Sequence, residues 1–260
     1  MPRESDLSIK LTEIQDAISD YLGYGPVFAE TDASEQLAVK TVIKRGERRA
    51  YHPPGVNGKP PHQWSFLRPL FSFDTVEDQW EYTLPPEYGG IEGDITFADN
   101  TTNYPCIQSL VEQKIREMRG VNDTSGQPRY YAIIALAHDR RIGQRYNLQL
   151  YPTPDAAYSL QFRMLINSQS MTQAFPYPYG GQKFSEVILA SCLAVAENFR
   201  HGGGDGSKQA DFMVQLEAAV KLDQDVHEPD TYGINRDGGL TRKNRDRTVG
   251  VDVTFNGVLY

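Results

Sequence analysis

Histidine and cysteine are the side chains that most often signal metal or nucleophilic chemistry, and their spacing in this chain indicates neither. The chain has five histidines, none at a metal-ligand spacing such as HExxH or HxH: His52, His62, His138, His201 and His227. His52 and His62 flank a Pro-rich loop, where solvated histidines explain them better than a metal site does. Cys106 and Cys192 form no CxxC motif, so we predict two buried thiols of a reducing compartment.

Glycine-rich and acidic segments also fall short of catalytic motifs. The cluster from Gly202 to Gly206 follows a predicted helix, whereas a phosphate-binding loop follows a strand, so we interpret it as a turn between helices. Acidic pairs such as Glu77 and Asp78 are explained by turns and helix ends. Neither a GxSxG nor a Walker-type motif is present. We therefore predict no catalytic residue, no cofactor and no metal; a hydrolase that uses scattered acids is the alternative.

Two basic runs are the strongest charge features of the chain. The run KRGERR, from Lys44 to Arg49, ends a predicted helix, where cations complement the helix dipole. Contact with an acidic partner surface explains this run equally well. The second run lies near the C-terminus, where we favour docking on a partner over a solvated tail or contact with DNA phosphate.

The C-terminal segment 227–260 carries the predicted partner-binding residues. Its last part alternates apolar and polar residues from Val249 onward, which is typical of a strand, and it has no local partner strand in the sequence. Such an arm often adds to another chain. The residues predicted to bind the partner are Arg242, Lys243, Arg245, Arg247, Val251, Val253, Phe255 and Tyr260.

Hydrophobic periodicity predicts helices near both ends of the chain. One covers residues 5–22, capped by Ser5 and striped with Leu7, Leu11, Ile14, Ile18 and Leu22. A second begins at Thr31–Asp32 or Ser34 and ends in the basic run, before a Pro- and Gly-rich loop at 50–62. Two further helices follow near the C-terminal end, at 184–199 and from Ala210 to Leu222.

The middle of the chain has the pattern of strands. Aromatic residues between Phe66 and Tyr82 predict strands around the turn DTVED, and residues 107–119 predict one helix that ends at Gly120. Residues 129–166 predict a half-buried antiparallel meander of three strands, because apolar and polar residues alternate in its last two arms.

These elements together predict an α+β fold. Helices from both ends form one bundle, an antiparallel β-rich lobe is inserted between them, and an extended C-terminal arm follows. The predicted division is 1–50 and 171–226 for the bundle, 51–170 for the lobe with its one helix, and 227–260 for the arm.

Composition limits the classes of partner. A net charge of -8 disfavours a protein that reads nucleic-acid sequence, which would carry a basic face, but it suits a wall that DNA slides past. The N-terminus lacks the apolar core of a signal peptide and no apolar run is long enough to cross a bilayer, so we expect no membrane partner.

Several sequence segments, taken in order along the chain, resemble the head-to-tail adaptor (connector) proteins of tailed bacteriophages. The clearest is YNLQLYPTPDAAYSLQFRMLI at 146–166. The others are WSFLRPLFSFDTVEDQWEYTLPPEYGGI at 64–91, IQSLVEQKIREM at 107–118, YYAI at 130–133 and FSEVILASCLAVAENF at 184–199. The resemblance extends roughly from Leu7 to Asp225.

This resemblance implies a structural virion protein that is not an enzyme. Its copies would form a ring, a dodecamer, beneath the portal, joining the capsid to the tail while double-stranded DNA passes through the lumen without sequence-specific binding. The implied partners are the portal protein, the tail tube or nozzle protein and further copies of the chain, with the C-terminal arm reaching the portal. A tail-tube or stopper component is the structural alternative.

Overall fold

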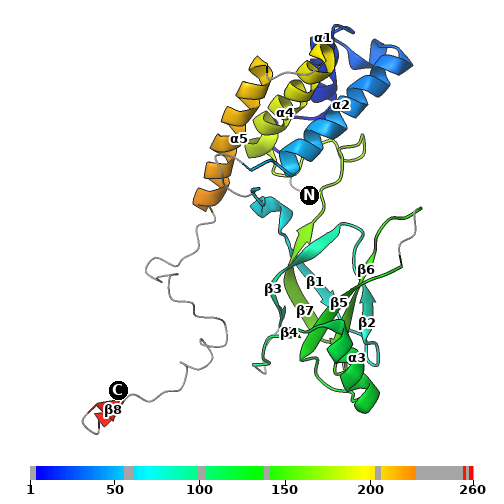
Figure 1. Ribbon diagram of the computed structural model, residues 1–260, viewed down its shortest axis with the longest axis vertical. Coiled ribbons are helices and arrows are strands. Elements are labelled where there is room, and N and C mark those ends of the chain that lie inside the picture. Colours follow the sequence, from blue (N-terminus) through cyan, green and yellow to red (C-terminus); the bar gives the residue numbers. More distant parts are fainter. Residues whose placement is uncertain are drawn as a thin grey trace. The chain divides into compact units, whose positions relative to one another are not determined.

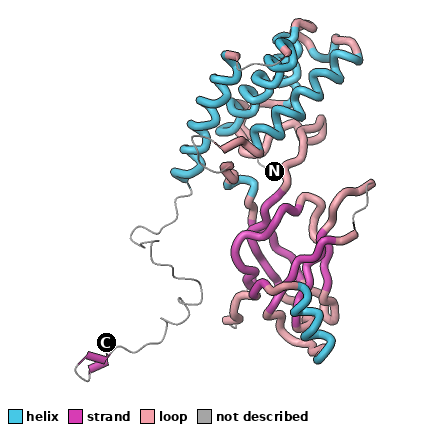
Figure 2. Tube along the Cα trace, in the orientation of Figure 1, coloured by secondary structure: helices cyan, strands magenta, loops and turns pink. Residues whose placement is uncertain are grey.

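The computed structural model describes residues 4–55, 61–98, 103–137, 141–202, 206–226, 254–255 and 258–259. The chain divides into two units, Met1–Gln224 and Asp225–Tyr260. Within the first unit, the described helices and sheets form a helical bundle and a β-rich lobe (Figures 1 and 2). The predicted α+β fold is therefore confirmed.

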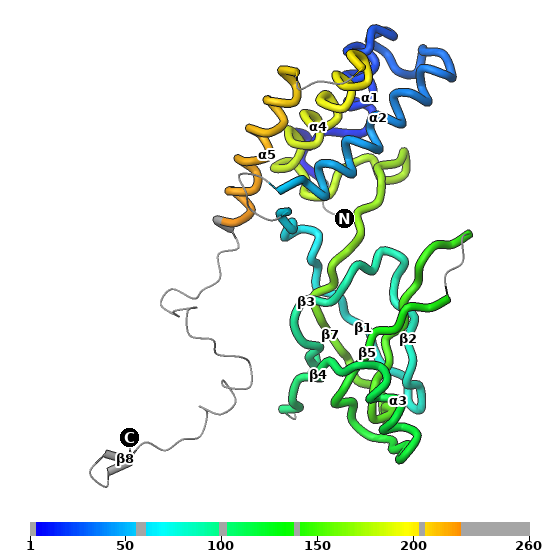
Figure 3. Tube along the Cα trace, in the orientation of Figure 1, coloured from blue at the N-terminus to red at the C-terminus, as the bar shows by residue number. Residues whose placement is uncertain are grey.

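Four helices form the bundle: α1 (Leu11–Leu22), α2 (Ala33–Tyr51), α4 (Gln182–His201) and α5 (Ser207–Val226). The helices before and after the lobe lie side by side, as the blue and yellow segments of Figure 3 show, and they bury one apolar core. Its fully buried members include Ile14, Val39, Ile188, Phe212 and Leu216, one or more from each helix. Burial of these side chains is the main source of stability for the bundle.

Helix α1 begins at Leu11, six residues later than predicted. Ser5 forms a turn in which the Ser8 amide donates to the Ser5 carbonyl (2.9 Å), and the Ile9 amide donates to Oγ of Ser185 on α4 (3.1 Å). These bonds hold residues 5–9 outside the helix and leave Leu7 76% exposed. At the other end Gly23 adopts a left-handed conformation (φ 84°), which ends the helix as predicted.

Helix α2 begins after Asp32, one of the predicted caps, whose amide donates to Oε2 of Glu35 (3.1 Å). It continues to Tyr51, so the predicted loop starts later than residue 50. Gly46 faces α4, where the hydroxyl of Ser191 donates to its carbonyl (2.8 Å). A Cβ on Gly46 would lie 2.8 Å from the Cα of Cys192, so glycine is what allows α2 and α4 to approach this closely.

The lobe contains two sheets that share one core. The first has the order β1 (Leu70–Asp74), β7 (Ser159–Ile166), β3 (Tyr88–Phe97), and it is antiparallel throughout. The second has the order β2 (Glu81–Thr83), β6 (Tyr146–Tyr151), β5 (Tyr130–Ala135), β4 (Gln108–Ser109), with only the β4–β5 pair parallel. Leu148 and Leu150 of β6 join Leu160 and Phe162 of β7 in the shared core.

The predicted three-stranded meander is wrong in its last step. β5 and β6 form a hairpin in which Tyr131 lies opposite Leu150, but β7 pairs with β1 and β3 in the other sheet. Strands β1 and β2 flank the turn DTVED as predicted, and this turn links the two sheets. The alternating patterns predicted which side chains are buried, but not which strands pair.

The predicted helix at 107–119 is shifted in the structure. Ile107 forms an isolated bridge to Ile95 of β3, Gln108 and Ser109 pair with β5 as β4, and α3 covers Glu112–Val121. Arg119 anchors α3: its Nη2 donates to the carbonyl of Leu150 (2.9 Å), and its guanidinium lies 3.8 Å from the centroid of the Trp80 ring.

In the second unit the structure describes a short antiparallel pair, β8 (Thr254–Phe255) and β9 (Val258–Leu259). Phe255 lies opposite Val258 in this pair. The prediction that the terminal arm has no local partner strand is therefore wrong at Phe255.

Candidate assembly surfaces

The described residues bring together no group of three or more His, Cys, Asp or Glu side chains that could hold a metal ion. In the same part of the chain, no helix has the length and apolar character needed to cross a membrane. Cys192 is buried as predicted, but Cys106 is exposed, because it lies in the segment leading into β4 at the surface of the lobe. His138 and His227 lie outside the described residues.

His62 is not the solvated loop residue that we predicted. Its Nε2 lies 2.7 Å from Oδ2 of Asp223 near the end of α5, and the two side chains are 15% and 13% exposed. Ser65 donates to the same carboxylate through its amide (3.1 Å) and its hydroxyl. Burial raises the pKa of Asp223, but the hydrogen bonds from Ser65 and His62 outweigh it, so the net shift is downward. Asp223 thus attaches the end of α5 to the segment that leads into β1.

An aromatic cluster fixes the same segment against the bundle. The indole of Trp64 is buried and donates from Nε1 to the carbonyl of Ala50 (3.0 Å). Its ring centroid lies 5.5 Å from that of Phe66 and 4.8 Å from that of Phe184, which in turn stacks on Tyr51 at 5.5 Å. These contacts and the Asp223 hydrogen bonds attach the start of the lobe to α2, α4 and α5.

Two buried carboxylates join separate parts of the bundle. Glu47 of α2 accepts hydrogen bonds from the amide of Met171 (2.7 Å) and the hydroxyl of Ser170, and burial raises its pKa despite these bonds and the charge of Lys44. Glu197 of α4 accepts from the amides of Lys208 (3.0 Å) and Gln209 (3.3 Å) in the first turn of α5. The hydrogen bonds that each accepts explain both carboxylates as structural anchors.

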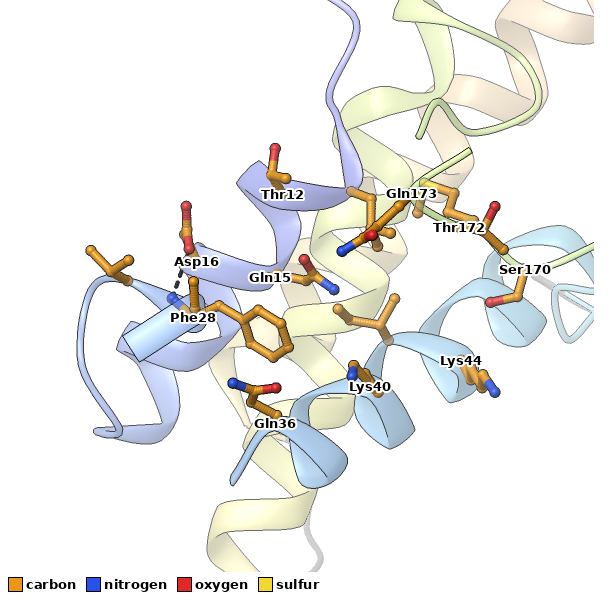
Figure 4. Close-up of a pocket in the computed structure, with 15 residues that line it drawn as sticks. Thr12, Gln15, Asp16, Phe28, Gln36, Lys40, Lys44, Ser170, Thr172 and Gln173 are labelled. Atoms are coloured by element: carbon orange, nitrogen blue, oxygen red, sulfur yellow. Dashed lines mark hydrogen bonds between the residues drawn. The ribbon is translucent and has the colours of Figure 1, made fainter. Parts of the chain in front are cut away.

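An open groove of about 720 Å³ lies between α1, α2 and residues 170–173 (Figure 4). Its lining is mixed: Gln15, Gln36 and Thr172 are polar, whereas Phe28 and Ile43 are apolar. Asp16 accepts a hydrogen bond from the amide of Phe28 (2.9 Å). Lys40 and Lys44 lie on successive turns of α2 along this groove.

The exposed side of α2 is strongly basic. We define the α2 ridge as the six exposed residues Leu37, Lys40, Thr41, Lys44, Arg45 and Arg48. None of its four cations forms a salt bridge with the described residues. Three members of the basic run KRGERR do not belong to the ridge. Gly46 and Glu47 are buried, and the guanidinium of Arg49 lies 4.8 Å from the centroid of the Phe212 ring.

A second groove, of about 280 Å³, runs between α4 and α5. We define the α4–α5 groove by the exposed acids Glu186 and Asp211 and the apolar residues Leu189, Leu193 and Val214. Val214 is 66% exposed, so the groove presents an apolar side chain to solvent.

The predicted partner-binding residues are mostly untested by the structure. Phe255 lies in β8, whereas the others, in the ranges 242–247, 251–253 and at 260, lie outside the described residues. The assignment of these side chains to a partner therefore stays a prediction.

Comparison with known families decides the class of this protein. Residues 9–236 match the SU10 adaptor protein family, a span that includes both the bundle and the lobe. The chain belongs to this family. No curated protein matches it. The predicted resemblance to phage head-to-tail adaptors is thereby confirmed, and membership makes the chain a structural phage adaptor protein.

Sequence reasoning missed the Asp223 junction and the two faces of the bundle. His62 and Asp223 are 161 residues apart, so no local spacing signals their contact. The α2 ridge was partly visible as the run KRGERR, but only the packing of α2 on α4 shows which of those residues face outward.

Proposed function

We propose that this protein is the head-to-tail adaptor of a tailed phage, a virion component that forms a ring beneath the portal and joins the capsid to the tail. The observation that carries this proposal is the match to the adaptor family over residues 9–236, which spans the bundle and the lobe together. The helical content supports an adaptor over a tail-tube or stopper component, because such components usually lack helices at both ends of the lobe.

The same proposal includes a dodecameric ring whose lumen passes double-stranded DNA. The net charge of -8 supports it, because an acidic wall repels phosphate and lets DNA slide. Its partners are the portal, the tail tube or nozzle protein and neighbouring copies of itself, and its role needs no catalysis.

Native mass spectrometry of the purified chain, alone and mixed with portal rings of the same phage, tests the proposal directly. We expect a ring of defined stoichiometry on the portal, visible in negative-stain images, and the chain among the proteins of mature particles. A chain that ignores the portal and is missing from particles would refute the proposal.

We further propose that residues 227–260 dock on the portal through the cations at 242–247 and the apolar residues that follow. A chain ending at residue 226 should then stay folded but bind portal rings weakly. Changing Arg242, Lys243, Arg245 and Arg247 to glutamate should weaken binding in a salt-dependent way. Portal binding that is unchanged by both variants would contradict this role.

A further inference from the structure

We infer that neighbouring copies in the ring meet through the α2 ridge of one subunit and the α4–α5 groove of the next. This inference rests on the proposed ring and names the two faces that build it. Nothing in the sequence signals the second face, because its residues come from two helices and from their outward sides only.

The two faces lie on opposite sides of the bundle. At about 3.6 residues per turn, the side of α2 that packs on α4, with Val39, Ile43 and Gly46, is opposite to the ridge positions 37, 41, 44 and 48. On α4, Ser191 and Cys192 contact α2, and Glu186 and Leu193 on the far side line the groove. Figure 1 accordingly shows α4 between α2 and α5.

In a ring of identical subunits, each copy contacts its two neighbours through two different faces. A contact between two copies of the same face closes as a dimer, whereas a contact between two different faces repeats from subunit to subunit and gives a ring when the rotation closes, or an open filament when it does not. A single bundle that exposes two complementary, opposed faces therefore has the geometry of a ring-forming unit.

The chemistry of the two faces is complementary. The ridge presents Lys40 and Lys44 one turn apart, about 6 Å along the helix axis. The groove presents the carboxylates of Glu186 and Asp211, and Lys208 lies 3.6 Å from one oxygen of Asp211 only. Opposite charges across an interface set its register and exclude wrong pairings.

Both faces also expose apolar side chains that could pack together. Leu37, at one end of the ridge, is 66% exposed, and Val27 beside the neighbouring groove is 41% exposed. The α4–α5 groove offers Leu189, Leu193 and the exposed Val214 as an apolar surface. Burial of these side chains between copies supplies affinity, and the charges around them supply specificity.

The chain itself is the acidic partner that the ridge needs. Its net charge is -8, yet α2 concentrates five cations between Lys40 and Arg49. Outside α2 the bundle is mainly acidic, so a second copy attracts the ridge at long range and the mixed surface of the groove binds it at short range.

A charge swap tests this contact in the portal assembly reaction. We compare a ridge variant, Lys40→Glu/Lys44→Glu, with a groove variant, Glu186→Lys/Asp211→Lys. Each alone places like charges across every contact, so the subunit–subunit dissociation constant should rise about tenfold or more and rings on the portal should be lost. In a ring where the two variants alternate, every contact again joins opposite charges, so rings should return when the two variants are mixed.

Helix α3 of the lobe supplies matched controls. Lys114→Glu/Arg116→Glu and Glu112→Lys/Glu117→Lys make the same charge changes away from both faces, at three exposed positions and the half-buried Glu112, and they should assemble like the wild type. Circular dichroism checks that every variant is folded.

A covalent readout establishes which faces meet. In a Cys106→Ser background, a chain carrying Leu37→Cys and Val214→Cys should give a ladder of cross-linked oligomers under a short bismaleimide. Leu37→Cys alone should give no dimers, and dimers would overturn the inference in favour of a two-fold contact.

Ring formation by both charge variants would also overturn the inferred contact while leaving the adaptor function intact. If such variants lost DNA binding at low salt, the ridge would instead be assigned to nucleic acid. A wild-type chain that forms no ring on the portal would refute the proposed function itself.

Discussion

Replacing Gly46 by alanine should destabilise the bundle, although alanine is the better helix former. Gly46 lies in the middle of α2, where it contacts α4. An added Cβ would lie 2.6 Å from Sγ of Cys192, 2.8 Å from its Cα and 3.0 Å from its amide nitrogen. Two of these atoms belong to the backbone, so a rotation of the Cys192 side chain cannot relieve the clash.

The expected size of the effect follows from two opposed terms. Carbon atoms pack best about 3.5–4.0 Å apart, so α2 and α4 must separate by at least about 0.7 Å to admit the methyl group. Overpacking of this kind costs about 1–3 kcal/mol, and a clash with backbone belongs near the upper end. The gain in helix propensity from glycine to alanine is about 1 kcal/mol. The net loss in the free energy of unfolding is therefore about 2 kcal/mol, or about 4–8 °C in Tm for a chain of this size.

Urea and thermal unfolding followed by circular dichroism measure this difference. Gly120→Ala is the matched control, because Gly120 lies near the end of α3 with no atom within 4 Å of its added Cβ, and it should raise stability by up to about 1 kcal/mol. A Cys192→Ala change in the Gly46→Ala background should recover only part of the loss, since the backbone contacts remain. If Gly46→Ala proved as stable as the wild type, the close approach of α2 and α4 would be wrong.

Three further predictions concern ionisable groups. The pKa of Asp223 in the folded protein lies below its ordinary value of 3.8. The stabilisation by its carboxylate is therefore complete above that pH and is lost as the pH falls through the folded pKa. Asp223→Asn should lower the free energy of unfolding at pH 7 and remove this part of its acid dependence in urea titrations. The pKa of Glu47 in the folded protein is raised above 4.5. The stabilisation by its protonated form is therefore complete below that pH and is lost as the pH rises through the folded pKa. Over that range the wild type should lose stability relative to Glu47→Gln, and parallel curves of unfolding free energy against pH for the two proteins would contradict this. Cys106 is exposed, whereas Cys192 is buried and burial raises the pKa of its thiol. A maleimide should therefore label one cysteine in the native protein and two in urea, as counted by mass spectrometry. Two labels under native conditions would show that the packing of α2 on α4 does not protect Cys192.

Much of the fold could be predicted because its helices carry strong local signals. Helix α4 has an almost unbroken apolar run from Val187 to Ala196, Asp32 and Glu35 form a cap signature for α2, and Gly23 ends α1. Strand pairing was predicted poorly, because pairing depends on contacts far apart in the sequence. β3 was missed altogether: it contains Gly90 and Gly93, and its register against β7 shifts between Glu92 and Thr96, so it lacks the regular alternation that identifies a strand.

The candidate surfaces could be predicted only in part, for a related reason. A basic run in a sequence does not say which of its members face a neighbouring helix. In KRGERR Gly46 packs against α4, Glu47 is buried where it accepts hydrogen bonds from residues 170 and 171, and Arg49 contacts Phe212. Lys44, Arg45 and Arg48 are left exposed beside Lys40. The dipole explanation applies to Arg48 and Arg49 in the last turn of α2, but it does not account for Lys40 and Lys44 farther back. Lys40 lies 5.7 Å from the centroid of the Phe28 ring in its own subunit, so contacts within the subunit account for part of this outward charge. The inferred contact between neighbouring copies adds a partner for the rest, because the α4–α5 groove of the next copy offers the carboxylates of Glu186 and Asp211.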